Sequence, residues 1–250
     1  MTVQLFVPCF VDQLYPHTAF NMIKLLEKAG CKVNYNPAQT CCGQPAFNAG
    51  FWDESRVVCA KFIKDFNPDQ PIVAPSASCV GFVKNYYTKL FDNSSLHHQA
   101  TAISKNIFEF SDFLVNKLKV TQFGAQLHGK ATYHDSCAAL RECKIKNEPR
   151  ILLSNVEGLE LIEMQDVETC CGFGGTFAVK FEPISIAMAE QKVEHALATE
   201  AKYIISTDLS CLMHLQGYID NKGYDLKTLH IADVLASSTA TAPLIPQGGT

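Results

Sequence analysis

Eleven cysteines are the side chains best able to do chemistry in this 250-residue chain. Eight of them fall into two sets of similar spacing: one Cys, a Cys-Cys-Gly tripeptide about thirty residues later, and a last Cys nearly forty residues further on. The sets are Cys9, Cys41, Cys42 and Cys79, and Cys137, Cys170, Cys171 and Cys211. Cysteine thiolates are soft ligands that select zinc, copper(I) or iron–sulfur clusters. The two sets therefore predict two metal or redox sites.

The same tetrapeptide surrounds both cysteine pairs, which indicates an internal duplication. Thr-Cys-Cys-Gly occurs at 40–43 and again at 169–172, whereas composition alone predicts about 0.03 Cys-Cys-Gly tripeptides in such a chain. The first cysteines of the two sets are offset by 128 residues and the last by 132. We therefore expect two related halves, residues 1–120 and 121–236, followed by a Pro- and Gly-rich disordered tail over 237–250.

Short apolar runs alternate with helical patterns in both halves, which is typical of an α/β fold with parallel strands. The predicted strands lie at 3–7, 32–35 and 72–74 in half one, and at 131–133, 159–162 and 203–205 in half two. The predicted helices of half one lie at 15–28, 51–66 and 80–91. In the first helix, Phe20, Ile23 and Leu26 follow helical spacing and are expected to face the core. Each half is thus expected to be a βαβ-type unit.

The predicted strands bring the cysteines of each set together. Each single cysteine and each Cys-Cys pair follows one of the three strands of its half. Because ligands bind beyond the carboxyl ends of parallel strands, where the loops converge, we expect four thiols at one rim in each half. The sequence thus predicts two cysteine sites at the carboxyl ends of the strands.

The adjacent Cys-Cys pair favours an iron–sulfur cluster over a zinc ion. Structural zinc is normally held by cysteines separated by a few residues, since both thiolates of one turn must reach one small ion. Neighbouring side chains in extended backbone point in opposite directions, and a cluster of several metal atoms accepts both. Gly43 and Gly172 tolerate positive φ, so the backbone can turn tightly beneath the cluster. Zinc stays an alternative for one of the sites.

The two cysteine sets resemble the cysteine-rich CCG domain family. The resemblance runs from about residue 3 to residue 235, with Pro8-Cys9, Ser78-Cys79, Asp135-Ser-Cys137 and Ser210-Cys211 in place beside the Cys-Cys-Gly motifs. The family includes one of the subunits of heterodisulfide reductase, the iron–sulfur subunit of glycolate oxidase and the lactate-utilisation A proteins. Since the chain lacks ferredoxin-type Cys-x2-Cys-x2-Cys runs, it is most similar to the lactate-utilisation A group.

The chain departs from the fullest form of the family motif at one position in each half. That form ends in Cys-x-x-Cys, and its first cysteine is replaced by Ser76 in half one and by Asp208 in half two. Four thiols per half are enough for a 4Fe–4S cluster, so electron transfer is a safer inference than disulfide cleavage. We expect Ser76 and Asp208 to cap the helices that follow them, and an oxygen ligand is the alternative.

The resemblance implies an iron–sulfur redox subunit of an L-lactate-oxidising complex, with one or two clusters that relay electrons as lactate becomes pyruvate. Its partners would be companion lactate-utilisation subunits, one of them a ferredoxin-type iron–sulfur protein, and the substrate of the complex a small 2-hydroxy acid. Glycolate or a heterodisulfide is the alternative substrate, and a zinc-organised interaction module the alternative class. No residue stands out as catalytic, and a complete Gly-x-Gly-x-x-Gly dinucleotide motif is absent.

Composition excludes several other classes of function. Lys and Arg number 21 against 25 Asp and Glu, so no basic excess exists to bind nucleic acid. No apolar stretch approaches the length of a transmembrane helix, and the first residues show no signal-peptide pattern. So many cysteines without a signal peptide indicate a reducing compartment, and we expect a cytoplasmic protein.

Two histidines lie close in sequence to cysteines of the second set. His134 precedes Cys137 by three residues and could activate it as a nucleophile, although half one has no histidine at that spacing. His214 follows Cys211 by three residues and could lie beside the ligand set. The three cysteines outside the duplicated pattern, Cys31, Cys59 and Cys143, are expected to be buried packing residues.

Replacing Cys42 by Ala should remove the cluster of half one, because three thiols cannot complete its ligand set. Replacing Cys59 by Ala should leave the metal content unchanged, because that side chain lies outside the set. Iron and acid-labile sulfide per chain, measured after anaerobic purification, check both variants. Equal loss of iron from the two variants would show that the ligand assignment is wrong.

Overall fold

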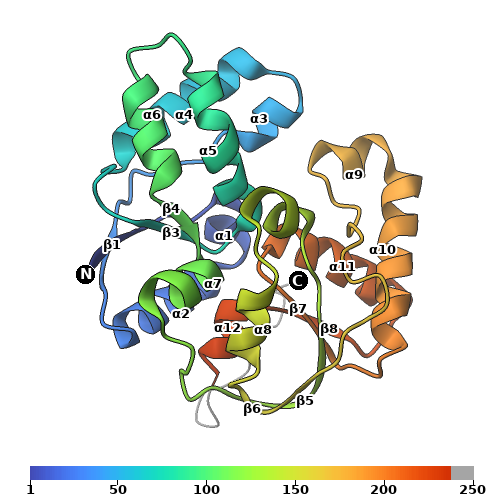
Figure 1. Ribbon diagram of the computed structural model, residues 1–250. Coiled ribbons are helices and arrows are strands. Elements are labelled where there is room, and N and C mark those ends of the chain that lie inside the picture. The colour runs from blue at the N-terminus through green and yellow to red at the C-terminus, as the bar shows by residue number, and fades with distance from the viewer. Residues whose placement is uncertain (238–250) are drawn as a thin grey trace.

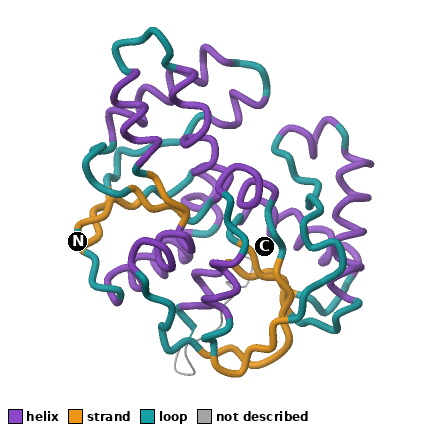
Figure 2. Tube along the Cα trace, in the orientation of Figure 1, coloured by secondary structure: helices purple, strands orange, loops and turns teal. Residues whose placement is uncertain are grey.

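Two separate sheets, each of four parallel strands, form the framework of the computed structural model, which describes residues 1–237 (Figures 1 and 2). The first sheet has the order β2-β1-β3-β4, from β1 (Thr2–Leu5), β2 (Lys32–Tyr35), β3 (Ile72–Ala74) and β4 (Ile107–Glu109). The second repeats it as β6-β5-β7-β8, from β5 (Gln126–Tyr133), β6 (Glu157–Leu161), β7 (Tyr203–Ser206) and β8 (Lys227–His230). The expected parallel α/β fold and its duplication are confirmed.

Helices follow the strands in nearly the same order in both halves. Half one contains α1 (Cys9–Leu14), α2 (Pro16–Lys28), α3 (Gln44–Asn48), α4 (Trp52–Asp65), α5 (Ala77–Leu90), α6 (His97–Lys105), α7 (Phe110–Asp112) and the π-helical η1 (Phe113–Leu118). Half two contains the π-helical η2 (Ala139–Cys143), α8 (Asn147–Leu153), α9 (Thr176–Lys180), α10 (Glu182–Leu197), α11 (Leu209–Lys222) and α12 (Ile231–Leu235). Within residues 1–237, no helix combines the length and the apolar character needed to cross a membrane.

The sequence prediction missed β4 and β8, the fourth strand of each sheet. Each is only three or four residues long and runs directly into a short helix, so no extended run of alternating residues marks it. The six predicted strands are present, and β5 begins five residues earlier than expected. Of the tail expected over 237–250, Ser237 packs against β5, its hydroxyl donating to the carbonyl oxygen of Gln126 at 2.8 Å. The remaining tail residues lie outside the described residues.

Helix α2 turns the expected face inward at Ile23 and Leu26 but not at Phe20. Leu26 is buried as predicted, but Phe20 is 63% exposed. The buried face of the helix instead contains Ala19, Met22 and Leu25 beside Leu26. Each residue advances by about 100° around a helix, so Phe20 lies nearly opposite Met22, which is at the centre of the buried face, and it points to solvent.

The first sheet separates two hydrophobic cores by the alternation of its side chains. Val3, Leu5 and Val73 face a large core that also contains side chains of half two, whereas Ile72 and Ala74 face a smaller core confined to half one. Successive side chains of a strand point to opposite faces, so even the short β3 contributes to both cores. The two halves therefore bury apolar surface against each other.

A short helix that follows the fourth strand of each half packs against the other half. Helix α7 packs on α8, and α12 packs on α2 (Figure 1). Asp233 of α12 is 3% exposed and accepts hydrogen bonds from Thr18 Oγ1 at 2.8 Å and Asn21 Nδ2 at 2.9 Å. Its carboxylate also lies 3.4 Å from His17 Nε2, and this hydrogen bond raises the pKa of His17. Burial opposes the ionisation of Asp233, but its hydrogen-bond partners and the nearby His230 together lower its pKa.

Replacing Asp233 by Asn should lower the free energy of unfolding by about 2 kcal/mol, because the buried Thr18 hydroxyl loses its charged acceptor. The raised pKa of His17 contributes stability that is complete below about pH 6.5 and is lost as the pH rises through the raised value. The variant should lose this pH dependence, and urea unfolding on both sides of that pH measures both effects. Asp112, at the matching position of α7, accepts from Asn116 at the surface, so Asp112→Asn is the control. Equal destabilisation by both substitutions would contradict the prediction.

Candidate metal centre

The eight cysteines of the two sets line a single cavity of about 260 Å³. Those of half one follow β1, β2 and β3, and those of half two follow β5, β6 and β7, as predicted. The strand order of each sheet reverses direction beside its first strand, and this is the place where parallel sheets bind ligands. The sequence predicted a separate group of four thiols at the edge of each sheet. In the structure, both groups line the same cavity. All eleven thiols are free.

In half one the four thiols influence one another's ionisation as a series. Cys41 interacts with Cys9 and Cys42, and Cys42 interacts with Cys79. The hydrogen bonds that Cys41 receives from Cys42 and Cys9 lower the pKa of its thiol to about 3. The same bonds, together with burial, raise the pKa of Cys9 and of Cys42. Metal ligation requires thiolates, so a soft cation that binds here would displace the protons held between these thiols.

Half two repeats the series with Cys170 in the place of Cys41. Hydrogen bonds from Cys137 and Cys171 lower the pKa of Cys170 to about 2. The pKa of Cys137 rises through its bond to Cys170, and that of Cys171 rises through its bonds to Cys170 and Cys211, with burial adding to both. Each half therefore holds one thiolate stabilised by two neighbouring thiols.

The two Cys-Cys-Gly turns have the same construction. Gly43 and Gly172 have φ angles of 93° and 94°, in the region that favours glycine, as predicted. A Cβ atom at Gly172 would also lie only 2.5 Å from the carbonyl oxygen of Ser185. The hydroxyl groups of Ser55 and Ser185 donate to the carbonyl oxygens of these glycines at 2.9 and 2.8 Å. His214 Nε2 lies 3.1 Å from the Ser185 hydroxyl, so this histidine does lie beside the second turn.

The three cysteines outside the sets do not line the cavity. Cys31 and Cys59 are buried as expected, and Cys143 is half-buried in η2. The Cys59 thiol donates to the carbonyl oxygen of Cys42 at 3.3 Å, directly beneath the first turn. Cys31, at the start of β2, is therefore a cleaner control than Cys59 for effects on metal content.

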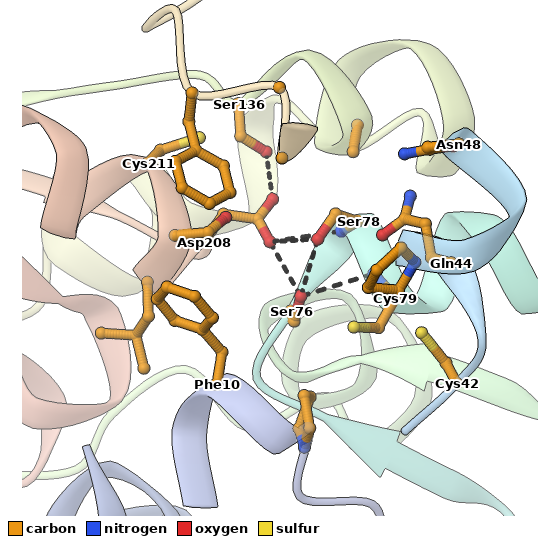
Figure 3. A pocket seen from close by; sticks show the side chains of 18 of the residues that line it. Phe10, Cys42, Gln44, Asn48, Ser76, Ser78, Cys79, Ser136, Asp208 and Cys211 are labelled. Atoms are coloured by element: carbon orange, nitrogen blue, oxygen red, sulfur yellow. Dashed lines mark hydrogen bonds between the residues drawn. The ribbon is translucent and has the colours of Figure 1, made fainter. Parts of the chain in front are cut away.

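Ser76 and Asp208, the positions at which the family motif has a cysteine, bind each other across the junction of the halves (Figure 3). Ser76 Oγ donates to Asp208 Oδ1 at 2.9 Å and accepts from the N–H of Cys79 at 3.4 Å, which confirms it as the cap of α5. Asp208 makes no side-chain hydrogen bond to its own helix α11, so the cap expected there is wrong.

Asp208 binds the helix terminus of the opposite half instead. Its Oδ1 accepts from the backbone N–H of Ser78 at 3.2 Å and from the Ser78 hydroxyl at 3.1 Å. Its Oδ2 accepts from the Ser136 hydroxyl at 2.6 Å. The positive end of a helix stabilises a carboxylate. The start of α5 offers Asp208 an N–H and two hydroxyl groups, whereas a cap on α11 would offer a single N–H, so Asp208 binds α5. Both carboxylate oxygens are occupied by protein donors, which argues against the alternative of an oxygen ligand.

His134 does not form the pair with Cys137 that the spacing allowed and that half one argued against. Its ring is fully buried, and neither ring nitrogen has a hydrogen-bond partner. Instead of pairing with Cys137, it places a ring nitrogen with the Sγ atoms of Cys171 and Cys211, all three lying within 4.8 Å of one another. Burial and the nearby Lys192 lower the pKa of His134 to about 3, so the ring is neutral. Buried polar atoms without partners cost about 1–3 kcal/mol each, and this makes the ring a candidate ligand.

The two halves differ in charge close to their thiols. Lys192 is fully buried and its Nζ donates to the carbonyl oxygens of Asp166 and Val167 at 2.7 and 3.2 Å, while burial lowers its pKa to about 8. The matching position of half one holds Phe62, whose ring packs edge-on against Phe6 at 4.8 Å between centroids. The match follows from Ser55 and Ser185, which bond to the glycines of the two turns; the Cys-Cys-Gly motifs alone would place Ile63 opposite Lys192.

In metal-free, reduced protein at pH 6, iodoacetamide should modify Cys41 before Cys9, although Cys9 is the more exposed of the two. The thiolate is the nucleophile, and the lowered pKa of Cys41 keeps it ionised while the raised pKa of Cys9 keeps it protonated. Mass spectrometry of peptides over a time course measures the order, and Cys170 and Cys137 supply the same comparison in half two. Earlier modification of Cys9 would overturn the assignment of the thiolate.

The chain matches known proteins along most of its length. The CCG family, described as "Cysteine-rich domain", matches residues 3–84 and 131–216. These two ranges contain both cysteine sets. A "Lactate utilization protein A" of Geobacillus kaustophilus is 40% identical over 235 residues, covering 94% of this chain and 98% of the relative. One from Halalkalibacterium halodurans is 42% identical, covering 94% and 96%. The "Uncharacterized protein YkgE" of Escherichia coli is 42% identical over 238 residues, covering 95% and 100%.

A solved structure shares the fold at low sequence identity. The crystal structure of a hypothetical protein from Helicobacter pylori matches with a TM-score of 0.61 and 12% identity. The match covers 97% of this chain and 49% of that one, so the chain spans about half the length of this structural relative. At this identity the likeness shows the fold alone.

Proposed function

The chain belongs to the family of cysteine-rich CCG domain proteins, and on that premise we propose that it is an iron–sulfur electron carrier of lactate utilisation. The observation that carries the proposal is the convergence of two four-thiol series on one cavity. Relatives named lactate utilization protein A, which align with nearly the whole chain, support lactate as the substrate of the system. The chain would relay electrons as L-lactate is oxidised to pyruvate.

The donor sets fit a 4Fe–4S cluster in each half. The four Sγ atoms of a tetrahedral zinc site lie about 3.8 Å apart, as Zn–S bonds of 2.3 Å require. Among the described residues, only His134, Cys171 and Cys211 bring three ligand atoms within 4.8 Å of one another, so neither set of four is that compact. A series of thiol contacts suits a centre of several metal atoms. When bound, such a centre would supply one-electron transfer.

The ligands proposed for the two clusters are the same residues that the sequence singled out. Half one would use Cys9, Cys41, Cys42 and Cys79, and half two Cys137, Cys170, Cys171 and Cys211. Cys79 and Cys211 lie in the first turns of α5 and α11, where the helix dipole stabilises anionic ligands. Zinc in half two is the alternative that the His134–Cys171–Cys211 group favours.

The hydrogen bonds of Asp208 would fix the two sites relative to each other. Those from Ser76 and Ser78 tie the start of α11, which carries Cys211, to the start of α5, which carries Cys79. Figure 3 shows Asp208 between Ser136 and the Ser76–Ser78 pair, with Cys79 and Cys211 on opposite sides. A constant separation between two redox sites favours electron transfer from one to the other without a conformational change.

The proposal includes a cytoplasmic protein that acts with companion lactate-utilisation subunits, one of them a ferredoxin-type iron–sulfur protein. Large apolar side chains are exposed at matching places of the two halves, Phe51 and Trp52 in one and Phe181 in the other. They adjoin α3 and α9, whose first residues line the cavity. Exposed aromatic side chains are typical of protein interfaces, so we assign the contact with an electron-transfer partner to this side of the molecule. Glycolate or a heterodisulfide remains the alternative substrate.

A strain from which the gene is deleted should fail to grow on L-lactate, because electrons from lactate then have no carrier. The wild-type gene and a Cys31→Ala variant should restore growth, whereas Cys42→Ala and Cys171→Ala should not, since each removes a proposed cluster ligand. Growth rates on L-lactate and on glucose separate this defect from a general one. Unimpaired growth of the deletion strain on L-lactate, with no substituting pathway, would contradict a role in lactate oxidation.

The same protein, purified without oxygen, tests the cofactor directly. It should be brown and contain iron and acid-labile sulfide. Colourless protein with stoichiometric zinc and no sulfide, even after anaerobic reconstitution, would contradict the iron–sulfur assignment.

A further inference from the structure

We propose that His134 is a fifth ligand of the metal centre in half two and binds it through a ring nitrogen. The centre of half one would then have thiolate ligands alone, so the two centres would differ in kind. This inference rests on the proposed function, because the centre concerned is the one that the second cysteine set would hold.

Backbone hydrogen bonds hold His134 at the carboxyl end of the central strand β5. The residue directly follows β5, and its N–H donates to the carbonyl oxygen of Ile205 at 2.8 Å. Its own carbonyl oxygen accepts from the Ser206 hydroxyl at 2.8 Å. Both partners belong to β7, the neighbouring strand, so the residue is anchored from its N–H and its carbonyl group at the carboxyl end of the sheet.

The ring has the position that a ligand needs. One nitrogen and the Sγ atoms of Cys171 and Cys211 all lie within 4.8 Å of one another. Nitrogen and sulfur ligands of one tetrahedral metal lie about 3.6 Å apart, given metal–ligand bonds of 2.0–2.3 Å. Small side-chain rotations would therefore bring the ring nitrogen within bonding distance of a metal atom held by Cys171 or Cys211. A neutral imidazole offers one nitrogen lone pair for this purpose.

Packing alone does not account for a histidine at this position. Phe6 holds the matching position in half one, where it is fully buried against Phe62 and Phe66. The imidazole of His134 is equally buried, yet neither of its nitrogens has a hydrogen-bond partner. Burying polar atoms without partners is unfavourable compared with burying an aromatic hydrocarbon ring. A metal bond to one nitrogen would satisfy an atom that the protein leaves unpaired.

Pulsed electron paramagnetic resonance of reduced protein labelled with nitrogen-15 histidine tests the bond. The cluster signal should show coupling to a nitrogen-15 nucleus, and His134→Phe should abolish this coupling. His98→Phe, at an exposed histidine of α6, should retain it. His214→Phe should retain it as well, and this control is needed because His214 lies beside the second turn.

Mössbauer spectra of iron-57 protein give a second measurement that does not require a paramagnetic state. One iron should differ from the others in the wild type because it carries an additional nitrogen ligand, and His134→Phe should remove that difference while the four cysteines preserve the iron content. The wild-type measurements alone can refute the proposal, so a variant that fails to fold does not weaken the test.

The two proposals fail in different ways. A cluster signal without nitrogen-15 coupling and with no distinct iron in the wild type would overturn the role of His134 and leave the proposed function intact. Coupling that persists in His134→Phe and disappears in His214→Phe would assign the nitrogen to His214 and overturn the proposal. Absence of iron and sulfide from the wild type would overturn the proposed function and this inference together.

Discussion

The site depends on one geometric constraint, the convergence of loops at the carboxyl edge of a parallel sheet. The order β2-β1-β3-β4 makes the three strands that precede cysteines direct neighbours, and the second sheet repeats the arrangement. Cysteines more than thirty positions apart in the chain therefore come together in short loops that follow adjacent strands. The shared core then holds the two edges together, so both thiol sets line one cavity.

Duplication supplied two equal frameworks, and later divergence made their surroundings unequal. The turns of Gly43 and Gly172 agree in φ angle and in the serine bond beneath them. Beside the thiols, however, half one has an aromatic packing where half two has His134 and Lys192. A buried ammonium group favours negative charge on nearby ligands, so the two sites would hold electrons with different affinity.

The spacing of the cysteines was enough to predict their grouping, the parallel fold and six of the strands, because the duplication repeats each signal. The orientation of Asp208 was out of reach, since its partners Ser76 and Ser78 meet it only through the packing of one half on the other. The single cavity shared by both thiol sets was also out of reach, because it too forms only where the two halves pack together. Strands β4 and β8 are too short to carry a periodic signal. Phe20 was misplaced because the buried face of α2 is centred on Met22, which lies nearly opposite Phe20 around the helix.

The exchange of short helices between the halves has a consequence for synthesis of the chain on the ribosome. Helix α2 forms among the first residues, but its partner α12 is the last helix of the described chain. Until α12 emerges, the buried face of α2 and the Thr18–Asn21 end of that helix lack their cover. Completion of the shared core is thus coupled to completion of the chain, and a truncated product would expose apolar surface that marks it for degradation.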